Sequence, residues 1–336
     1  MAATRINGGA TVQVKKTFVV PPPQRDTEEV PLTVFDLVAP AYHVTVLFAF
    51  SPPNPPTSDL VDALSATLPQ FPLLTARLDH HHHAGRLRPC FVTGRGGAGA
   101  LVVEAEVTSS SSLSDHLPLV PSPELAGLQP PVVETQHVLL VQINRFACGG
   151  LVVASSTQRQ VADRFSMGIF YNAWADPRVA TSQGHGIRVV DPCEIANLLL
   201  HFPTEFVAEL KRRAQGKYTT FETVTAHVWK SITTVRGLDA GTRTSVSGRG
   251  RLGGTAVLPK EGFFGNLVLT ASSGTTAREL TISTLADVAA LVRKGIRAVD
   301  RRYFRSFIDF GALHNDDDEE PLEPANMDVP GPNHLA

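Results

Sequence analysis

The chain has 336 residues, which exceeds the roughly 250 to 300 residues that a single hydrophobic core usually supports, so we expect two domains. Hydrophobic residues make up 43% and charged residues 18%, with 25 Pro and 26 Gly, which is typical of a globular protein and excludes a chain disordered throughout. The formal charge of −2 comes from 30 basic and 32 acidic residues mixed along the chain, so no global field favours nucleic-acid binding.

The cysteines and the N-terminus indicate the compartment. Cys90, Cys148 and Cys193 are widely spaced, odd in number and lack a CxxC pair, which is typical of reduced thiols in a cytosolic protein. Residues 1–16 lack the apolar core of a signal peptide, and no window approaches the ~20 apolar residues of a membrane span. The sequence therefore predicts a cytoplasmic protein.

Strands dominate the beginning of the chain, with one early helix. Apolar-rich runs predict strands over 12–20 and 43–50, and the Pro-rich break that follows supplies an N-cap for a helix over 59–70. Residues 86–93 and 100–107 are predicted as two strands around a Gly-rich turn.

The middle of the chain contains another pair of strands and a helix. The strands flank the turn "CGG" within residues 135–156, and the helix is predicted over 163–174. Residues 176–191 are polar, contain Gly and lack periodicity, so we expect the crossover between the domains there.

The second half is mostly helical by the same criteria. Its predicted elements are helices over 204–216, 219–238 and 285–310 and strands over 244–251 and 266–273. Thr204 and Thr220 are the predicted caps of the first two helices. The acidic, Pro-containing tail over 314–336 is expected to be mostly disordered.

A known family is indicated by the stretch "VADRFSMGIFYNAW" at 161–174. The chain resembles the plant BAHD acyl-CoA-dependent acyltransferases, whose signature is His-x-x-x-Asp followed by Gly and a helix. Further family landmarks stand in family order at 30–36 ("VPLTVFD"), 198–211 ("LLLHFPTEFVAELK"), 218–233 ("YTTFETVTAHVWKSIT"), 263–271 ("FFGNLVLTA") and 303–313 ("YFRSFIDFGAL"). The subgroup that it most resembles transfers hydroxycinnamoyl groups to amines such as agmatine or putrescine in cereals.

The resemblance implies an α/β fold with two chloramphenicol-acetyltransferase-like domains, built from mixed sheets with flanking helices. The implied divisions are a first domain over 1–176, a linker over 177–197, a partial second domain over 198–313 and the tail. The implied substrates are an acyl-CoA donor and an amine or alcohol acceptor, with acyl-CoA as co-substrate rather than a bound cofactor. No metal site, nucleic-acid partner or membrane partner is expected, and the chain is expected to be a monomer.

Two features depart from the family pattern. Arg159 stands where the family has its catalytic His, and Arg164 stands where it has the following Gly. A guanidinium has no acceptor lone pair and a pKa above ~12, so Arg159 cannot act as a general base near neutral pH. The Asp-Phe-Gly-Trp-Gly motif that follows 303–313 in the family is absent from this chain.

The motif Asp is Asp163, and the resemblance implies that it holds the loop by pairing with Arg249, or alternatively with Arg251. Two hypotheses on function remain open at this point. One is an acyltransferase that moves an acyl group, expected to be hydroxycinnamoyl, from coenzyme A to an amine or alcohol. The other is an inactive family remnant that binds acyl-CoA, because the base at Arg159 and the C-terminal motif are missing.

Other candidate motifs have ordinary structural interpretations. The run of histidines beginning at His80 lacks ligand spacing and is predicted as an exposed loop. His201 and His227 are predicted as core histidines. His137 and His185 stand at the wrong spacing to replace the motif His. Lys260 and Lys294 are not distinguished from surface lysines.

Overall fold

The structure is a computed structural model. It describes residues 3–6, 10–83, 86–108, 113, 123–132, 135–175, 185–187, 200–251, 263–316 and 334–335. The chain forms two compact units. The first unit comprises residues 1–199 and 262–266, and the second comprises 200–261 and 267–336. A five-residue segment from the second half of the sequence therefore belongs to the first unit. The domain limits predicted from the sequence stay a prediction.

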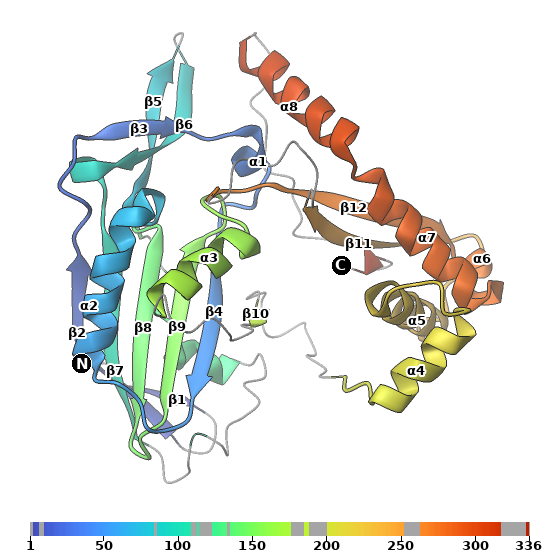
Figure 1. Ribbon diagram of the computed structural model, residues 1–336, viewed down its shortest axis with the longest axis horizontal. Coiled ribbons are helices and arrows are strands. Elements are labelled where there is room, and N and C mark those ends of the chain that lie inside the picture. Colours follow the sequence, from blue (N-terminus) through green and yellow to red (C-terminus); the bar gives the residue numbers. More distant parts are fainter. Residues whose placement is uncertain are drawn as a thin grey trace. The chain divides into compact units, whose positions relative to one another are not determined.

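Seven described strands form the main sheet of the first unit, in the spatial order β1-β2-β7-β8-β9-β4-β10 (Figure 1). Their bounds are Ala3–Ile6 for β1, Ala10–Val20 for β2, Ala100–Thr108 for β7, Leu139–Phe146 for β8, Leu151–Gln158 for β9, His43–Phe50 for β4 and His185–Ile187 for β10. The β7–β8 pair is parallel and the other pairs are antiparallel. Every residue of β9 is buried, so this strand is enclosed on both faces.

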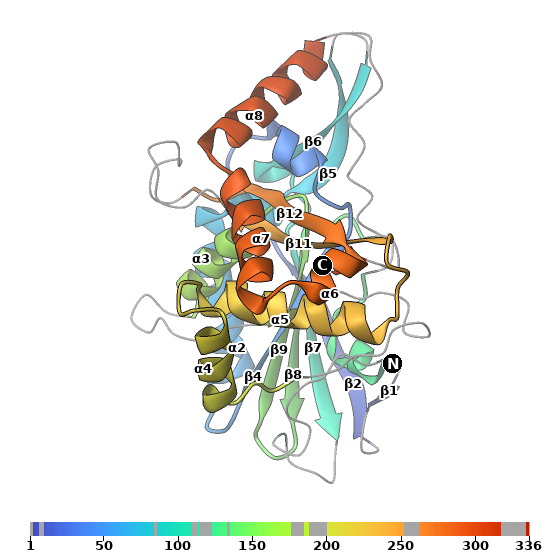
Figure 2. The same cartoon turned by 90° about the vertical axis from the view of Figure 1, so that its right-hand side faces the viewer.

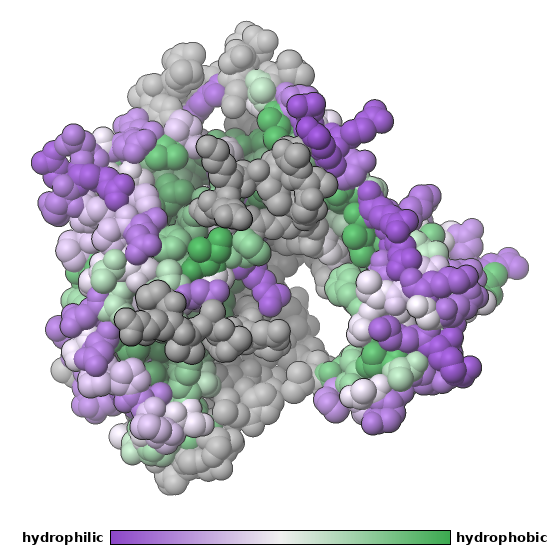
Figure 3. All heavy atoms as spheres, viewed as in Figure 1, coloured by the Kyte–Doolittle hydropathy of each residue, from purple (hydrophilic) through white to green (hydrophobic). Residues whose placement is uncertain are grey.

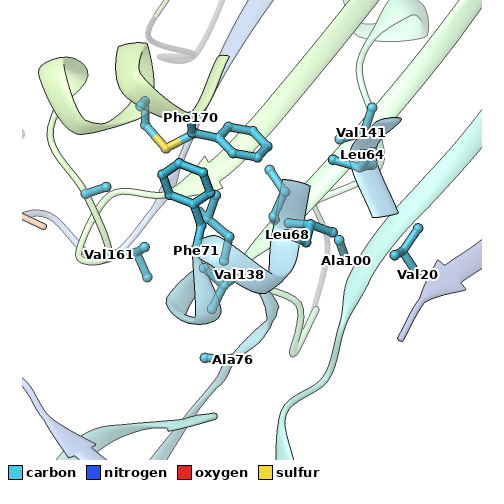
Figure 4. Packing of buried hydrophobic residues seen from close by; sticks show 14 of the residues in the cluster. Val20, Leu64, Leu68, Phe71, Ala76, Ala100, Val138, Val141, Val161 and Phe170 are labelled. Atoms are coloured by element: carbon cyan, nitrogen blue, oxygen red, sulfur yellow. The ribbon is translucent and has the colours of Figure 1, made fainter. Parts of the chain in front are cut away.

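Two helices, α2 (Thr57–Thr67) and α3 (Arg164–Trp174), lie against one face of this sheet (Figure 1). Leu64, Leu68, Phe71 and Phe170 converge with strand residues in the main core, as Figure 4 shows. The rings of Phe71 and Phe170 meet edge to face with centroids 5.4 Å apart, a favourable aromatic geometry. The apolar residues that recur at helical spacing in 59–70 and 163–174 are thus the ones that pack against the sheet.

The two strands predicted over 86–93 and 100–107 are confirmed, but they do not pair with each other across the Gly-rich turn. β6 (Arg86–Thr93) pairs with β5 (Arg77–His83) and β3 (Glu28–Pro31) in a separate three-stranded sheet, whereas β7 belongs to the main sheet. The intervening turn packs on residues 25–26 instead of reversing the strand. Gly94 has φ 62°, and a Cβ there would lie 2.1 Å from the carbonyl oxygen of Asp26. Only glycine fits this close approach without strain.

Two smaller expectations for the first unit also need correction. The histidines from His80 belong to β5 rather than to a loop, although His80 itself is exposed as expected. The N-cap position of α2 is Pro56, which has no side chain that can cap the helix. Most of the predicted linker lies outside the described residues, but 185–187 form β10 and pair with β4.

The second unit combines a small sheet with five helices among its described residues. β11 (Arg243–Arg251) pairs antiparallel with β12 (Val268–Thr276) and parallel with β13 (His334–Leu335). The helices are α4 (Thr204–Arg213), α5 (Thr220–Val235), α6 (Ala277–Ile282), α7 (Leu285–Ala298) and α8 (Arg301–Asp316). α7 lies across the β11–β12 pair (Figure 2), where Ser273 Oγ donates a hydrogen bond to the Leu291 carbonyl at 2.8 Å. Trp229 of α5 is buried in the same core.

Helix ends in this unit differ from the predicted ones. Thr219, not Thr220, caps α5 in a capping box with Glu222. α4 begins at Thr204 without a side-chain cap, because Pro203 holds the N-cap position. The helical region 285–310 is two helices, and the second has a largely hydrophilic visible face (Figure 3). The predicted disordered tail lies mostly outside the described residues, except the end of α8 and β13.

Within the part of the chain that the structure describes, no helix combines the length and the apolarity needed to cross a membrane.

Candidate active site

The motif loop, residues 159–163, connects the buried strand β9 to helix α3. The first residue of the loop is held by a hydrogen bond from the Arg159 amide to the carbonyl of Tyr42, at 2.9 Å. Tyr42 is the residue directly before β4. The Val161 amide donates to the Gln158 carbonyl at 3.0 Å and closes a turn. The loop therefore begins where β9 ends, beside the first residue of its antiparallel partner β4.

Asp163 ends the loop as the N-cap of α3. Its carboxylate accepts a hydrogen bond from the Ser166 amide at 2.9 Å, and the residue is 1% exposed. An Asp at this position satisfies a helix amide that has no partner within the helix. The motif Asp thus orients the loop and the first turn of the helix and is not open to solvent.

The segment 263–266 packs against the loop within the first unit. The Gly265 carbonyl accepts the Asp163 amide at 3.2 Å and the Ser166 hydroxyl at 2.8 Å. Gly265 has φ 154°, where a side chain is strained, and an added Cβ would lie 3.0 Å from the Phe263 ring. The landmark "FFGN" is therefore the part of the sequence that supports the motif loop.

Asn266 connects this segment to the loop and to a second landmark. Its amide nitrogen donates to the Gln160 carbonyl at 2.8 Å and to the Asp36 carboxylate at 2.9 Å. Its amide oxygen accepts from the Arg159 guanidinium. The landmarks at 30–36 and 263–271 thus meet at the motif loop, a role that the sequence did not assign to Asp36 or Asn266.

Asp36 carries a buried carboxylate beside this cation. Burial raises the pKa of Asp36, while hydrogen bonds from Thr33 and Asn266 and the charge of Arg159 oppose the rise. One carboxylate oxygen accepts from Asn266, and the other accepts from the Thr33 amide at 2.8 Å and hydroxyl at 2.7 Å. Both oxygens are therefore committed to holding α1 (Val34–Leu37) and the loop.

Arg159 has a structural position at the place of the family's His. Its guanidinium donates to the Ala162 carbonyl at 3.1 Å and to Asn266. A guanidinium that bonds one acceptor of its own loop and one of the segment 263–266 stabilises the loop, and it has no lone pair with which to take a proton. Arg159 can contribute positive charge to this region but cannot act as a general base.

A histidine that the sequence did not single out lies beside the loop. His43 opens β4, is half-buried and pairs in register with Gln158, the residue before Arg159. Its Nε2 lies 3.0 Å from the His137 carbonyl oxygen. Burial lowers the pKa of His43, and the hydrogen bond to His137 opposes this. No local sequence pattern links His43 to the motif, because it stands 116 positions before Arg159. The pairing of β4 with β9 brings it next to the motif loop.

The structure describes the other basic residues considered in the sequence only in part. Arg249 and Arg251 form part of β11, but their side chains lie outside those described, so the pairing with Asp163 stays a prediction. Lys260 is outside the described residues, and Lys294 is exposed on α7. The side chain of His185 is also outside them.

Two histidines of the second unit were predicted to be core residues. His201 is exposed, so its prediction is wrong. His227 is half-buried and meets the Phe206 ring edge to face, with centroids 5.4 Å apart. Burial lowers the pKa of His227, and the nearby charge of Arg213 adds to this.

Solved structures similar to this chain show its fold. Vinorine synthase matches with a TM-score of 0.65 and 17% identity over 93% of this chain and 82% of its own. TRI101 of F. sporotrichioides, in a complex with coenzyme A and T-2, matches with a TM-score of 0.59 and 15% identity over 88% of this chain and 82% of its own. The predicted fold class, two chloramphenicol-acetyltransferase-like domains, is confirmed by these likenesses.

Similar plant proteins cover most of the chain. Tryptamine hydroxycinnamoyltransferase 2 and putrescine hydroxycinnamoyltransferase 3 of Oryza sativa subsp. japonica are each 32% identical, over 86% and 92% of this chain and 75% and 79% of their own lengths. Agmatine coumaroyltransferase-1 of Hordeum vulgare is 32% identical over 84% of this chain and 72% of its own length. The model of the Transferase family matches residues 10–199 and 196–321. The chain therefore belongs to the Transferase family, the BAHD acyl-CoA-dependent acyltransferases, which use acyl-CoA as co-substrate.

Proposed function

We propose that this chain transfers a hydroxycinnamoyl group from its coenzyme A thioester to an amine, and that it does so as a cytoplasmic monomer. The observation that carries the proposal is the naming of its relatives. Three plant proteins at 32% identity, each aligned over at least 84% of this chain, are named for hydroxycinnamoyl or coumaroyl transfer with tryptamine, putrescine or agmatine. All three named acceptors are amines.

The reaction requires a nitrogen nucleophile and a place for its proton. The free-base amine attacks the thioester carbonyl carbon, the C–N bond forms, and the C–S bond breaks to release the coenzyme A thiolate. The proton that leaves the nitrogen finally converts the thiolate to the thiol. Proton acceptance by a positioned group typically contributes 10² to 10⁴ in rate, so the identity of the acceptor matters.

The test uses p-coumaroyl-CoA with agmatine, putrescine and tryptamine in separate reactions. We expect release of the coenzyme A thiol together with an amide product of the correct mass for at least one amine, above the level of a reaction without the protein. A further reaction uses 4-amino-1-butanol, a molecule that carries both an amine and an alcohol, and we expect the N-acyl product. An O-acyl product would instead assign the chain to alcohol acylation.

A second candidate is a non-catalytic protein that binds acyl-CoA. The observation that favours it is the guanidinium of Arg159, which stands at the family's His position and bonds Ala162 of its own loop and Asn266 beside the loop. Calorimetry with p-coumaroyl-CoA separates the two functions. Binding of the thioester without any amide product supports the second candidate, and turnover excludes it.

A further inference from the structure

We propose that His43 accepts the proton of the amine in this chain, and that Gln158 orients the amine beside it. The inference rests on the proposed function, because it names the group that completes amine acylation where the motif position holds Arg159. It follows from the tautomer of His43, from an acceptor on Gln158 that has no donor among the described residues, and from the pairing of β4 with β9.

The hydrogen bond of His43 fixes its tautomer. The His137 carbonyl oxygen can only accept, so the nitrogen 3.0 Å from it, Nε2, carries the hydrogen. In a neutral imidazole the other nitrogen, Nδ1, then holds the lone pair. Nδ1 has no hydrogen-bond donor among the described residues, so the lone pair of His43 is not committed to one of them while the contact of Nε2 holds the ring in place.

The electrostatic surroundings keep His43 neutral near neutral pH. Burial lowers its pKa, and the carbonyl of His137 opposes the shift. Its ionisable neighbours include Tyr42, which precedes it in the sequence, Arg159, whose amide bonds the Tyr42 carbonyl, and His137, whose carbonyl it contacts. No charged side chain among the described residues contributes to the shift of His43. A neutral imidazole is the form that accepts a proton.

Gln158 supplies a second acceptor on the same face of the sheet. Directly opposed residues of an antiparallel pair project to one face with Cβ atoms about 4.5–5.5 Å apart. His43 and Gln158 are such a pair, as are Thr45 and Ser156, whose hydroxyls hydrogen-bond at 2.8 Å on that face. The side-chain oxygen of Gln158 is buried without a donor in the described structure, and the residue is 9% exposed.

Buried acceptors without donors are rare, because an unpaired polar group costs about 1–3 kcal/mol. Nδ1 of His43 and the side-chain oxygen of Gln158 are both acceptors, so they suit a ligand that presents N–H donors. A primary amine presents two as the free base. One N–H bonds to Gln158, and the other points to His43 Nδ1, which takes the proton as the C–N bond forms.

The proton balance closes within one turnover. His43 becomes an imidazolium when the amine nitrogen loses its proton, and the leaving coenzyme A thiolate receives that proton. The ring returns to its neutral tautomer, the C–N bond has formed, and the C–S bond has broken. The other carboxylates near the loop are unsuited to this role, since both oxygens of Asp36 accept hydrogen bonds and Asp163 caps α3.

The decisive variant is His43→Gln. The glutamine amide can still donate to the His137 carbonyl, so the strand keeps its contact while the base is lost. We expect kcat/KM to fall 10²- to 10⁴-fold with p-coumaroyl-CoA and agmatine. His227→Gln is the matched control, because His227 is also half-buried with a lowered pKa but belongs to the second unit, and it should change kcat/KM less than about threefold.

A pH profile separates a proton acceptor from a structural residue. An alkyl amine has a pKa of about 10, so log kcat/KM should rise with a slope of about one below that pH. In the unsubstituted protein the slope should steepen to about two below the pKa of His43, which lies under its usual value of 6.5. His43→Gln should keep the slope of about one throughout, and added imidazole should restore part of the activity of His43→Ala.

Gln158→Met tests the orienting role separately. It replaces the acceptor by an apolar side chain of similar length, so we expect about a tenfold rise in KM for the amine and a smaller change in kcat. Turnover by the unsubstituted protein together with full activity of His43→Gln would overturn this inference alone. A loss of activity in His137→Gln but not in His43→Gln would overturn it as well. Absence of turnover in the unsubstituted protein overturns the proposed function and the inference with it.

Discussion

The side chain of Asn266 joins segments that are far apart in the sequence. It bonds Asp36, the Gln160 carbonyl and Arg159, and it is 4% exposed. Truncating it leaves a buried carboxylate oxygen and a buried carbonyl without their donors. We therefore expect Asn266→Ala to lower the free energy of unfolding by about 2–4 kcal/mol.

Urea unfolding measures this change, with Asn54→Ala as the control. Asn54 is only half-buried and donates to the Gly149 and Phe50 carbonyls, so its loss should cost less than about 1 kcal/mol. Equal effects of the two substitutions would contradict a central role for Asn266.

Asp36 and Arg159 are coupled through their charges. The folded-state pKa of Asp36 is raised above its ordinary value of 3.8, so its contribution to stability is present at low pH and is lost as the pH rises through that pKa. Arg159→Met removes a cation that lowers this pKa, so we expect the pKa of Asp36 to rise further. Stability should then fall more steeply with rising pH than in the unsubstituted protein.

NMR titration of the Asp36 carboxyl carbon checks the shift directly. Arg95→Met is the control, because Arg95 pairs with the exposed Asp26 and not with Asp36. A pKa of Asp36 that stays unchanged in Arg159→Met would show that the two groups are not coupled.

At the scale of elements, the start of helix α3 depends on Asp163. Asp163→Ala removes its cap and should cost about 0.5–2 kcal/mol. Asp163→Asn keeps a capping oxygen, so it should cost little if capping is the main role. If the predicted ion pair with Arg249 or Arg251 also contributes, Asp163→Asn should cost nearly as much as Asp163→Ala, and Arg249→Ala or Arg251→Ala should reproduce that loss in urea unfolding.

At the scale of the whole molecule, each unit contains one of the two tryptophans, which gives each its own fluorescence reporter. Trp174 donates to the Leu60 carbonyl in the first unit, and Trp229 donates to Thr244 in the second. The variants Trp174→Phe and Trp229→Phe therefore report one unit each. Urea unfolding of both variants measures the stability of the two units separately.

The second unit should lose stability in acid through Glu222. Arg293 bonds this carboxylate, with an N–O distance of 2.6 Å, and holds the pKa of Glu222 at about 2, below its ordinary value of 4.5. The stability that the pair provides is therefore complete above pH 4.5 and is lost as the pH falls towards about 2. In Trp174→Phe, the Trp229 transition should shift to lower urea over that range.

Glu222→Gln on the same background is the control for this acid effect. It should unfold at lower urea near neutral pH, by up to about 3 kcal/mol, and show a smaller dependence on pH. An unchanged acid shift in Glu222→Gln would assign the effect to other carboxylates of the second unit.

Local sequence patterns predicted several elements and the family of the chain. Strands β4, β8 and β9 and helix α3 agree closely with their apolar runs and with the cap at Asp163, because side-chain period and capping chemistry act within a few residues. The landmark motifs indicated an acyltransferase, and the family match confirmed it. The substitution of Arg159 for the motif His was also visible in the sequence alone.

Only the tertiary structure decided which distant residues meet. Strand pairing places His43 opposite Gln158, and Asn266 reaches Asp36 across 230 positions, contacts that no local period encodes. The same limit applies to β6 and β7, two strands that were predicted correctly and are consecutive in sequence but pair in different sheets. The period of the apolar residues along a strand or helix determines which of its faces is buried. Which residues meet on that face depends on the packing of the whole chain, and this is why His43 could be identified as the candidate proton acceptor only from the tertiary structure.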